Sequence, residues 1–110
     1  MSATRLTTKR VEKPRGRINL WPGFGSVVPG GATVGEIWFE APSDPELLIK
    51  YLFTSEKLSI QDHPDDMAAR ARGYPRGKDE AWVELAADPR ASIAIGTEGR
   101  QSRTFGHFCR

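Results

Sequence analysis

The chain has 110 residues, of which 38% are hydrophobic and 27% are charged, and its formal net charge at pH 7 is +2. This composition is typical of a single globular domain and excludes the disordered class, which combines low hydrophobicity with high net charge. No apolar stretch is long enough to cross a bilayer, and the basic N-terminus lacks the apolar segment of a signal peptide. We therefore expect no membrane partner. Cys109 is the single cysteine, so no internal disulfide can form, which favours a cytoplasmic location.

Residues 1–35 are predicted to be a basic, glycine- and proline-rich lead-in. Pro14 and Gly16 discourage regular structure over residues 1–20, and residues 21–35 predict an extended loop. The cations of the lead-in are Arg5, Lys9, Arg10, Lys13, Arg15 and Arg17. A basic run of this kind could bind nucleic acid, but it has no interleaved aromatic residues and no recognisable binding motif. We interpret it as a solvated segment or as cations for a phosphate ester, and expect no nucleic-acid partner.

The first predicted strands follow this lead-in. Residues 36–40 alternate with the period of a strand and place Ile37 and Phe39 on one side. The nearly continuous apolar run over residues 47–54 predicts a second strand, buried on both faces. Residues 58–63 predict a third. Short strands joined by tight turns favour an antiparallel sheet.

A short helix is predicted next. Pro64 ends the third strand, and either Asp65 or Asp66 can cap a helix over residues 67–72, with Gly73 just past its end.

Two more strands are expected, near residues 80–85 and over residues 91–95. The periodic pattern ends at Gly96, and residues 97–110 form a polar, basic tail. The sequence thus predicts a mainly β fold with one short helix, and an organised domain over residues 36–96.

The segment Leu58-Ser59-Ile60-Gln61-Asp62-His63-Pro64 is the most informative part of the chain for chemistry. Side chains of a strand alternate between its two faces. The polar face, rich in potential ligands, carries Ser59, Gln61 and His63. The opposite face, which we expect to lie toward the core, carries Leu58, Ile60 and Asp62.

A single Gln-x-His pair is weak evidence, because a lone histidine is more often a hydrogen-bonded surface residue. Glu80 strengthens the case, since it begins another predicted strand and adds a carboxylate to the amide oxygen of Gln61 and the imidazole of His63. A mixed set of nitrogen and oxygen ligands suits a borderline divalent ion such as zinc in a catalytic site. Structural zinc sites usually need thiolates, and this chain has one cysteine.

Three runs of the sequence resemble the type I mannose-6-phosphate isomerases: residues 35–39, residues 51–66 and residues 77–83. The similarity covers roughly residues 9–96 in the same order, which makes it more specific than any single motif. That family consists of zinc-dependent cupin enzymes that interconvert mannose 6-phosphate and fructose 6-phosphate. The resemblance implies a partial cupin-type jelly roll of antiparallel strands, incomplete at the C-terminus.

The resemblance also implies roles for individual residues. Gln61, His63 and Glu80 match three of the family's zinc ligands. Ser59 matches a serine associated with the substrate phosphate, and Lys78 matches a lysine proposed for proton transfer and substrate binding. Without the resemblance, Lys78 would be interpreted as a solvated loop residue and Ser59 as an ordinary strand serine. The chemistry is consistent, because moving a proton between C1 and C2 of a sugar phosphate develops negative charge that a divalent cation stabilises.

The chain departs from the family after residue 96. The family's fourth ligand, a histidine, lies farther downstream, and His107 stands in a tail that does not resemble the family. We therefore expect a fragment without isomerase activity. The alternative is a small non-catalytic cupin that binds a metal or a sugar through Gln61, His63 and Glu80. Oligomeric state and metal identity stay open.

Overall fold

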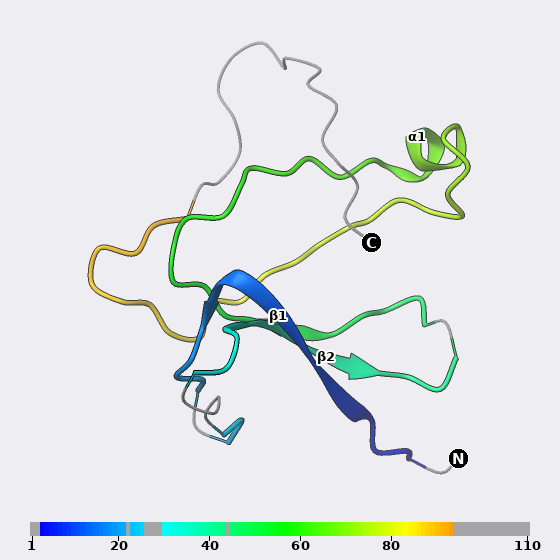
Figure 1. Cartoon of the computed structure of the whole chain (residues 1–110). Coiled ribbons are helices and arrows are strands. Elements are labelled where there is room, and N and C mark those ends of the chain that lie inside the picture. Colours follow the sequence, from blue (N-terminus) through cyan, green and yellow to red (C-terminus); the bar gives the residue numbers. More distant parts are fainter. Residues whose placement is uncertain (1–2, 22, 26–29, 44, 94–110) are drawn as a thin grey trace. The chain divides into compact units, whose positions relative to one another are not determined.

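The computed structural model describes residues 3–21, 23–25, 30–43 and 45–93. The chain divides into two compact units, Met1–Ser59 and Ile60–Arg110. The described part contains three strands and one helix: β1 (Thr7–Arg17), β2 (Val34–Glu40), β3 (Lys50–Leu52) and α1 (Asp66–Arg70) (Figure 1). It is mainly β, as predicted. The predicted domain boundaries at residues 35 and 96 stay a prediction.

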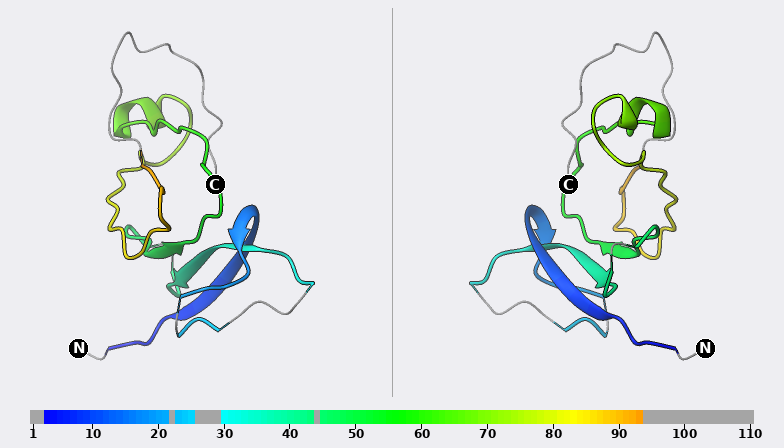
Figure 2. Two further views of the ribbon diagram at one scale, coloured as in Figure 1. Left: turned by 90° about the vertical axis from the view of Figure 1, so that its left-hand side faces the viewer. Right: turned by 90° about the vertical axis from the view of Figure 1, so that its right-hand side faces the viewer.

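The first unit is built on an antiparallel sheet in the order β1-β2-β3. Lys9 lies opposite Trp38, and Ile37 lies opposite Tyr51. The pairing of β1 with β2 shifts register on both sides of Glu12, and β1 bends across β2 (Figure 2). Irregularities of this kind increase the local twist of an antiparallel pair.

The first unit contains a small buried core and a group of packed aromatic rings. Ile37 is 2% exposed and is the largest fully buried side chain among the described residues. Aromatic rings from the loop and the strands of this unit pack against one another, with the ring centroid of Phe24 4.6 Å from that of Tyr51 and the ring centroid of Phe39 5.9 Å from that of Tyr51. The prediction of a strand over residues 36–40 with Ile37 and Phe39 on one side is confirmed.

The expectation that residues 1–20 lack regular structure is wrong, because β1 occupies Thr7–Arg17. Pro14 is tolerated, since it falls between Glu12 and Arg17, where the ladder to β2 is interrupted. Gly16 is required there: a Cβ atom at this position would lie 2.3 Å from the carbonyl oxygen of Val34. Pro14 and Gly16, which disfavour a strand in general, are therefore both compatible with β1.

The second predicted strand is shorter and more exposed than expected. Only Lys50–Leu52 forms a strand, although Ile49 and Phe53 also bond to β2. Burial on both faces is wrong, since Leu47, Leu48 and Ile49 are 72%, 43% and 56% exposed. The segment lies at an edge of the sheet, and no described element of its own unit covers these side chains.

The predicted strands at residues 58–63 and 80–85 do not form. Leu58 and Ile60, expected to lie toward the core, are 43% and 85% exposed, and Asp62 is exposed as well. Residues 91–93 also lack regular structure, and residues 94–95 lie outside the described part. A strand needs a neighbour to pair its backbone groups, and none of the described segments provides one here.

The predicted helix is confirmed. The carboxylate of Asp65 caps α1 by accepting a hydrogen bond from the backbone N–H of Ala68 at 2.8 Å. Gly73 follows the helix with a φ of +83°, a conformation that glycine adopts without strain. Over the described part of the chain, no helix has the length and apolar character needed to span a membrane. The tail, with His107 and Cys109, lies outside the described residues.

Candidate functional site

A close backbone approach in the second unit positions the candidate site. A Cβ atom on Gly77 would lie 2.5 Å from the carbonyl oxygen of Pro64, so only glycine fits at this distance. The N–H of Gly77 donates to the carboxylate of Asp66 at 2.9 Å, and the N–H of Lys78 donates to the carbonyl of Pro64 at 3.2 Å. The segment that carries Lys78 and Glu80 is thereby held beside the segment that carries His63.

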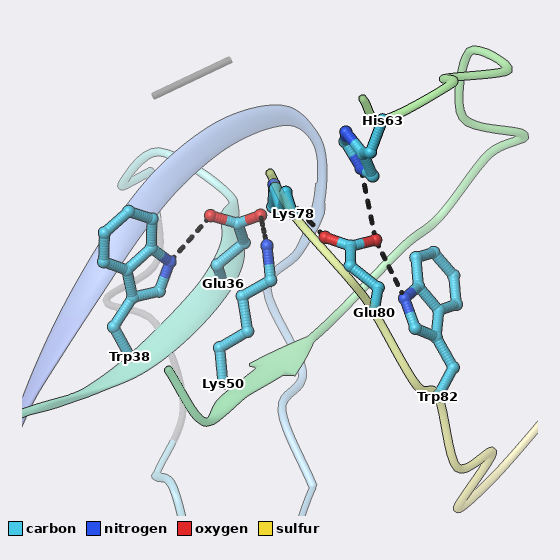
Figure 3. A network of polar contacts seen from close by, with 7 residues as sticks. All are labelled: Glu36, Trp38, Lys50, His63, Lys78, Glu80 and Trp82. Carbon is cyan, nitrogen blue, oxygen red and sulfur yellow. Dashed lines mark hydrogen bonds and ion pairs between the residues drawn. The ribbon is translucent and has the colours of Figure 1, made fainter. Parts of the chain in front are cut away.

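The side chain of Glu80 is the centre of the resulting cluster (Figure 3). Nε2 of His63 lies 3.3 Å from Oε2 of Glu80, and Nζ of Lys78 lies 3.2 Å from Oε1. The indole N–H of Trp82 donates to Oε2 of Glu80 at 3.3 Å. Each carboxylate oxygen of Glu80 therefore has a nitrogen partner.

The electrostatic surroundings keep Glu80 ionised. Partial burial raises the pKa of its carboxyl, but this effect is outweighed. The hydrogen bond and charge of Lys78, the hydrogen bond of Trp82 and the charge of His63 lower the pKa below its usual value. An ionised carboxylate next to an imidazole is a pair of groups that can bind a cation or orient a proton.

Trp82 is a member of the cluster that the sequence analysis missed. Its signal was present, because Lys78, Glu80 and Trp82 are spaced by two and an extended segment places such residues on one side. The strand expected near residues 80–85 included this tryptophan, but no role was assigned to it. Trp82 is 59% exposed, and its indole N–H donates to Glu80.

The remaining predicted site residues are not part of these contacts. Gln61 is exposed, and within the described residues no hydrogen bond joins it to His63 or Glu80. Ser59 is exposed and is the last residue of the first unit. The structure thus brings together His63, Lys78 and Glu80, three of the five residues assigned from the sequence.

A second cluster, in the first unit, has the same local pattern without a histidine. Glu36 accepts a hydrogen bond from the indole of Trp38 at 2.8 Å on Oε2 and pairs with Nζ of Lys50 at 3.1 Å on Oε1 (Figure 3). Partial burial raises the pKa of Glu36, but hydrogen bonds from Trp38 and Lys50 and nearby cationic charge lower it overall. Both sites therefore share a Glu-x-Trp sequence and a lysine, and the imidazole is what distinguishes Glu80.

The donor atoms that the structure brings together are few. No group of three or more histidine, cysteine, aspartate or glutamate side chains arranged for a metal ion occurs among the residues that the structure describes. His63 and Glu80 supply two donors, and an amide such as Gln61 would be needed for a third. Comparisons of the chain with family models, with curated proteins and with solved structures found no match.

Proposed function

We propose that this chain is the N-terminal part of a zinc-dependent sugar-phosphate isomerase similar to the type I mannose-6-phosphate isomerases, built as a partial cupin jelly roll. The observation that carries the proposal is the meeting of His63 and Glu80 at 3.3 Å, with Lys78 on the other oxygen of the carboxylate. These are three of the positions to which the resemblance assigns metal binding and proton transfer.

The distance between the two donor atoms fits a metal site. Neighbouring ligands of a tetrahedral zinc ion, each about 2.0–2.1 Å from the metal, lie roughly 3.3 Å apart. The separation of Nε2 of His63 from Oε2 of Glu80 has this value, 3.3 Å. We assign Gln61 as the third ligand.

A bound divalent ion would polarise the sugar oxygens and stabilise the charge that develops during isomerisation. Lys78 is the residue of this chain that we assign to moving the proton between C2 and C1. Its ammonium is held at 3.2 Å by Glu80 while its side chain stays 41% exposed, so a substrate can reach it. The hydroxyl of Ser59 is assigned as a hydrogen-bond donor to the substrate phosphate.

The 110-residue chain itself is proposed to bind the metal without turnover, since three ligands are assigned and the resemblance calls for four. Isothermal titration with zinc tests the metal site. Zinc affinity should fall roughly tenfold or more in His63→Ala and in Glu80→Gln. Glu36→Gln is the matched control, because it changes the same kind of cluster without a histidine, and should leave zinc affinity unchanged.

An isomerase assay and a sugar titration separate the outcomes. Binding of mannose 6-phosphate that needs zinc and is lost in Lys78→Ala supports isomerase ancestry. Zinc binding with no response to any sugar phosphate favours the non-catalytic cupin. Equal zinc affinity in all variants would contradict both.

A further inference from the structure

The outer edge of β3 presents backbone groups that the sheet does not use. The N–H of Phe39 donates to the carbonyl of Ile49 at 3.0 Å, and the N–H of Phe53 donates to the carbonyl of Gly35 at 2.8 Å. Backbone groups of successive residues point to opposite edges of a strand. The odd-numbered residues of this segment therefore face β2, and the N–H and C=O groups of Leu48, Lys50 and Leu52 face outward.

The opposite edge of the sheet, formed by β1, is protected against strand addition, unlike the edge formed by β3. β1 carries Lys9, Arg10, Lys13, Arg15 and Arg17, contains Pro14, and has two register irregularities. Cations, proline and bulges are the devices by which edge strands avoid pairing with another chain. A second copy that approached β1 would meet like charges and a missing donor.

On the β3 edge the single cation is already neutralised. The ammonium of Lys50 lies 3.1 Å from Oε1 of Glu36 and 6.0 Å from the centre of the Trp38 ring. Both members of the ion pair are largely covered, with side chains 25% and 13% exposed. Lys50 therefore lies along the strand toward β2, and its charge does not guard the edge as a solvated lysine would.

The side chains beside this edge are apolar and exposed. Leu47 and Ile49 are 72% and 56% exposed, and Leu48 is 43% exposed. The whole run over residues 47–54 has high β-propensity, one charge and no proline, the pattern of segments that pair with copies of themselves. A net charge of +2 on the chain opposes such pairing only weakly.

We propose that β3 is a self-association edge, at which residues 47–54 of two copies of this chain pair antiparallel about a two-fold axis. The pairing extends the three-stranded sheet across the axis and covers the apolar side chains of both copies. Registers that place Lys50 opposite Leu48 or Leu52 of the second copy are favoured, because like charges directly opposite one another destabilise an antiparallel pair. One strand pair buries less than the roughly 1,600 Å² of a standard interface, so the dimer forms reversibly.

Sedimentation equilibrium over a roughly hundredfold range of protein concentration measures the association. The expected result is a monomer–dimer equilibrium without larger species. Leu48→Pro removes an outward N–H and leaves the bonds to β2 in place, so the dimer should weaken about tenfold or more. Hydrogen exchange gives a second readout: the amides of Leu48, Lys50 and Leu52 should gain protection with concentration, whereas those of Tyr51 and Phe53 should be protected throughout.

Leu48→Lys and Val83→Lys form a matched pair, since each replaces an exposed apolar side chain with a cation and only the first lies at the β3 edge. Val83 is 82% exposed. The proposal predicts a weaker dimer for Leu48→Lys alone. A chain that stays monomeric at every concentration would overturn the proposal. So would equal effects of the two lysines, or open-ended aggregation without a dimer. This test does not involve metal, so its outcome is separate from that of the proposed function.

Discussion

Nε2 of His63 lies 3.3 Å from Oε2 of Glu80, across a junction that exists because Gly77 has no side chain. The two residues are far apart in sequence and stand on segments without regular secondary structure. What holds them is the pair of hydrogen bonds from Gly77 and Lys78 to Asp66 and Pro64. The geometry of the candidate site is therefore a property of a loop junction next to α1.

Gly77→Ala should disrupt this junction. The added Cβ would lie 2.5 Å from the carbonyl oxygen of Pro64, and relief of that overlap must move one segment away from the other. We expect a destabilisation of about 1–3 kcal/mol, together with a change in the His63 imidazole resonances in NMR spectra. Gly73→Ala is the control, because a Cβ there meets open space and costs only the strain of a positive φ. Identical His63 resonances in both variants would contradict this account.

Acid should weaken the first unit through Glu36. Its pKa is lower in the folded chain than the usual value of 4.5, so its stabilising effect is fully present above that value and is lost as the pH falls through the lower folded pKa. Urea unfolding of the wild-type chain should show declining stability below about pH 4.5.

Glu36→Gln should flatten that pH dependence and cost about 1 kcal/mol at neutral pH, because it removes the negative charge from a covered ion pair with Lys50. Glu40→Gln, at the exposed end of β2, is the control and should retain the wild-type slope. A steep acid slope that persists in Glu36→Gln would show that another group is responsible.

The first unit has little apolar core to lose. Val34, Ile37 and Ala69 are the buried hydrophobic residues among those that the structure describes, and Ala69 belongs to the second unit. Ile37→Ala should therefore cost about 2–5 kcal/mol, which is enough to unfold a marginal sheet. Ile60→Ala, at a side chain 85% exposed, should change stability by less than about 0.5 kcal/mol. Near-UV circular dichroism follows the loss of the Phe24, Phe39 and Tyr51 packing.

Local signals predicted the elements that local interactions stabilise. The residues that begin and end α1, Asp65 and Gly73, lie within a few residues of the helix. The alternation of Ile37 and Phe39 indicates β2 directly. β1 was missed because its strand depends on pairing with β2, which overrides the local preferences of Pro14 and Gly16. The reverse holds for residues 58–63. Their alternation of apolar and polar side chains favours a strand, but none of the described residues pairs with this segment.

The candidate site could likewise be predicted only in part from the sequence. Gln-x-His spacing and the resemblance indicated His63, Lys78 and Glu80, whose side chains do meet. These side chains do not meet on the face of a sheet, because neither segment is a strand. A tight approach between loops depends on Gly77 and on hydrogen bonds to the backbone, and neither has a periodic signature in sequence. Trp82 was overlooked for a related reason, because its indole is a polar partner of Glu80 as well as an apolar ring.

The claim that His63 and Glu80 bind one zinc ion together is tested most directly by following the His63 imidazole by ¹H–¹⁵N NMR during a zinc titration. Our account predicts that zinc shifts the Nε2 resonance of His63 in the wild-type chain and in Glu36→Gln, and that Glu80→Gln abolishes or greatly weakens this response. A His63 resonance unaffected by zinc, or affected equally with and without the Glu80 carboxylate, would contradict the account.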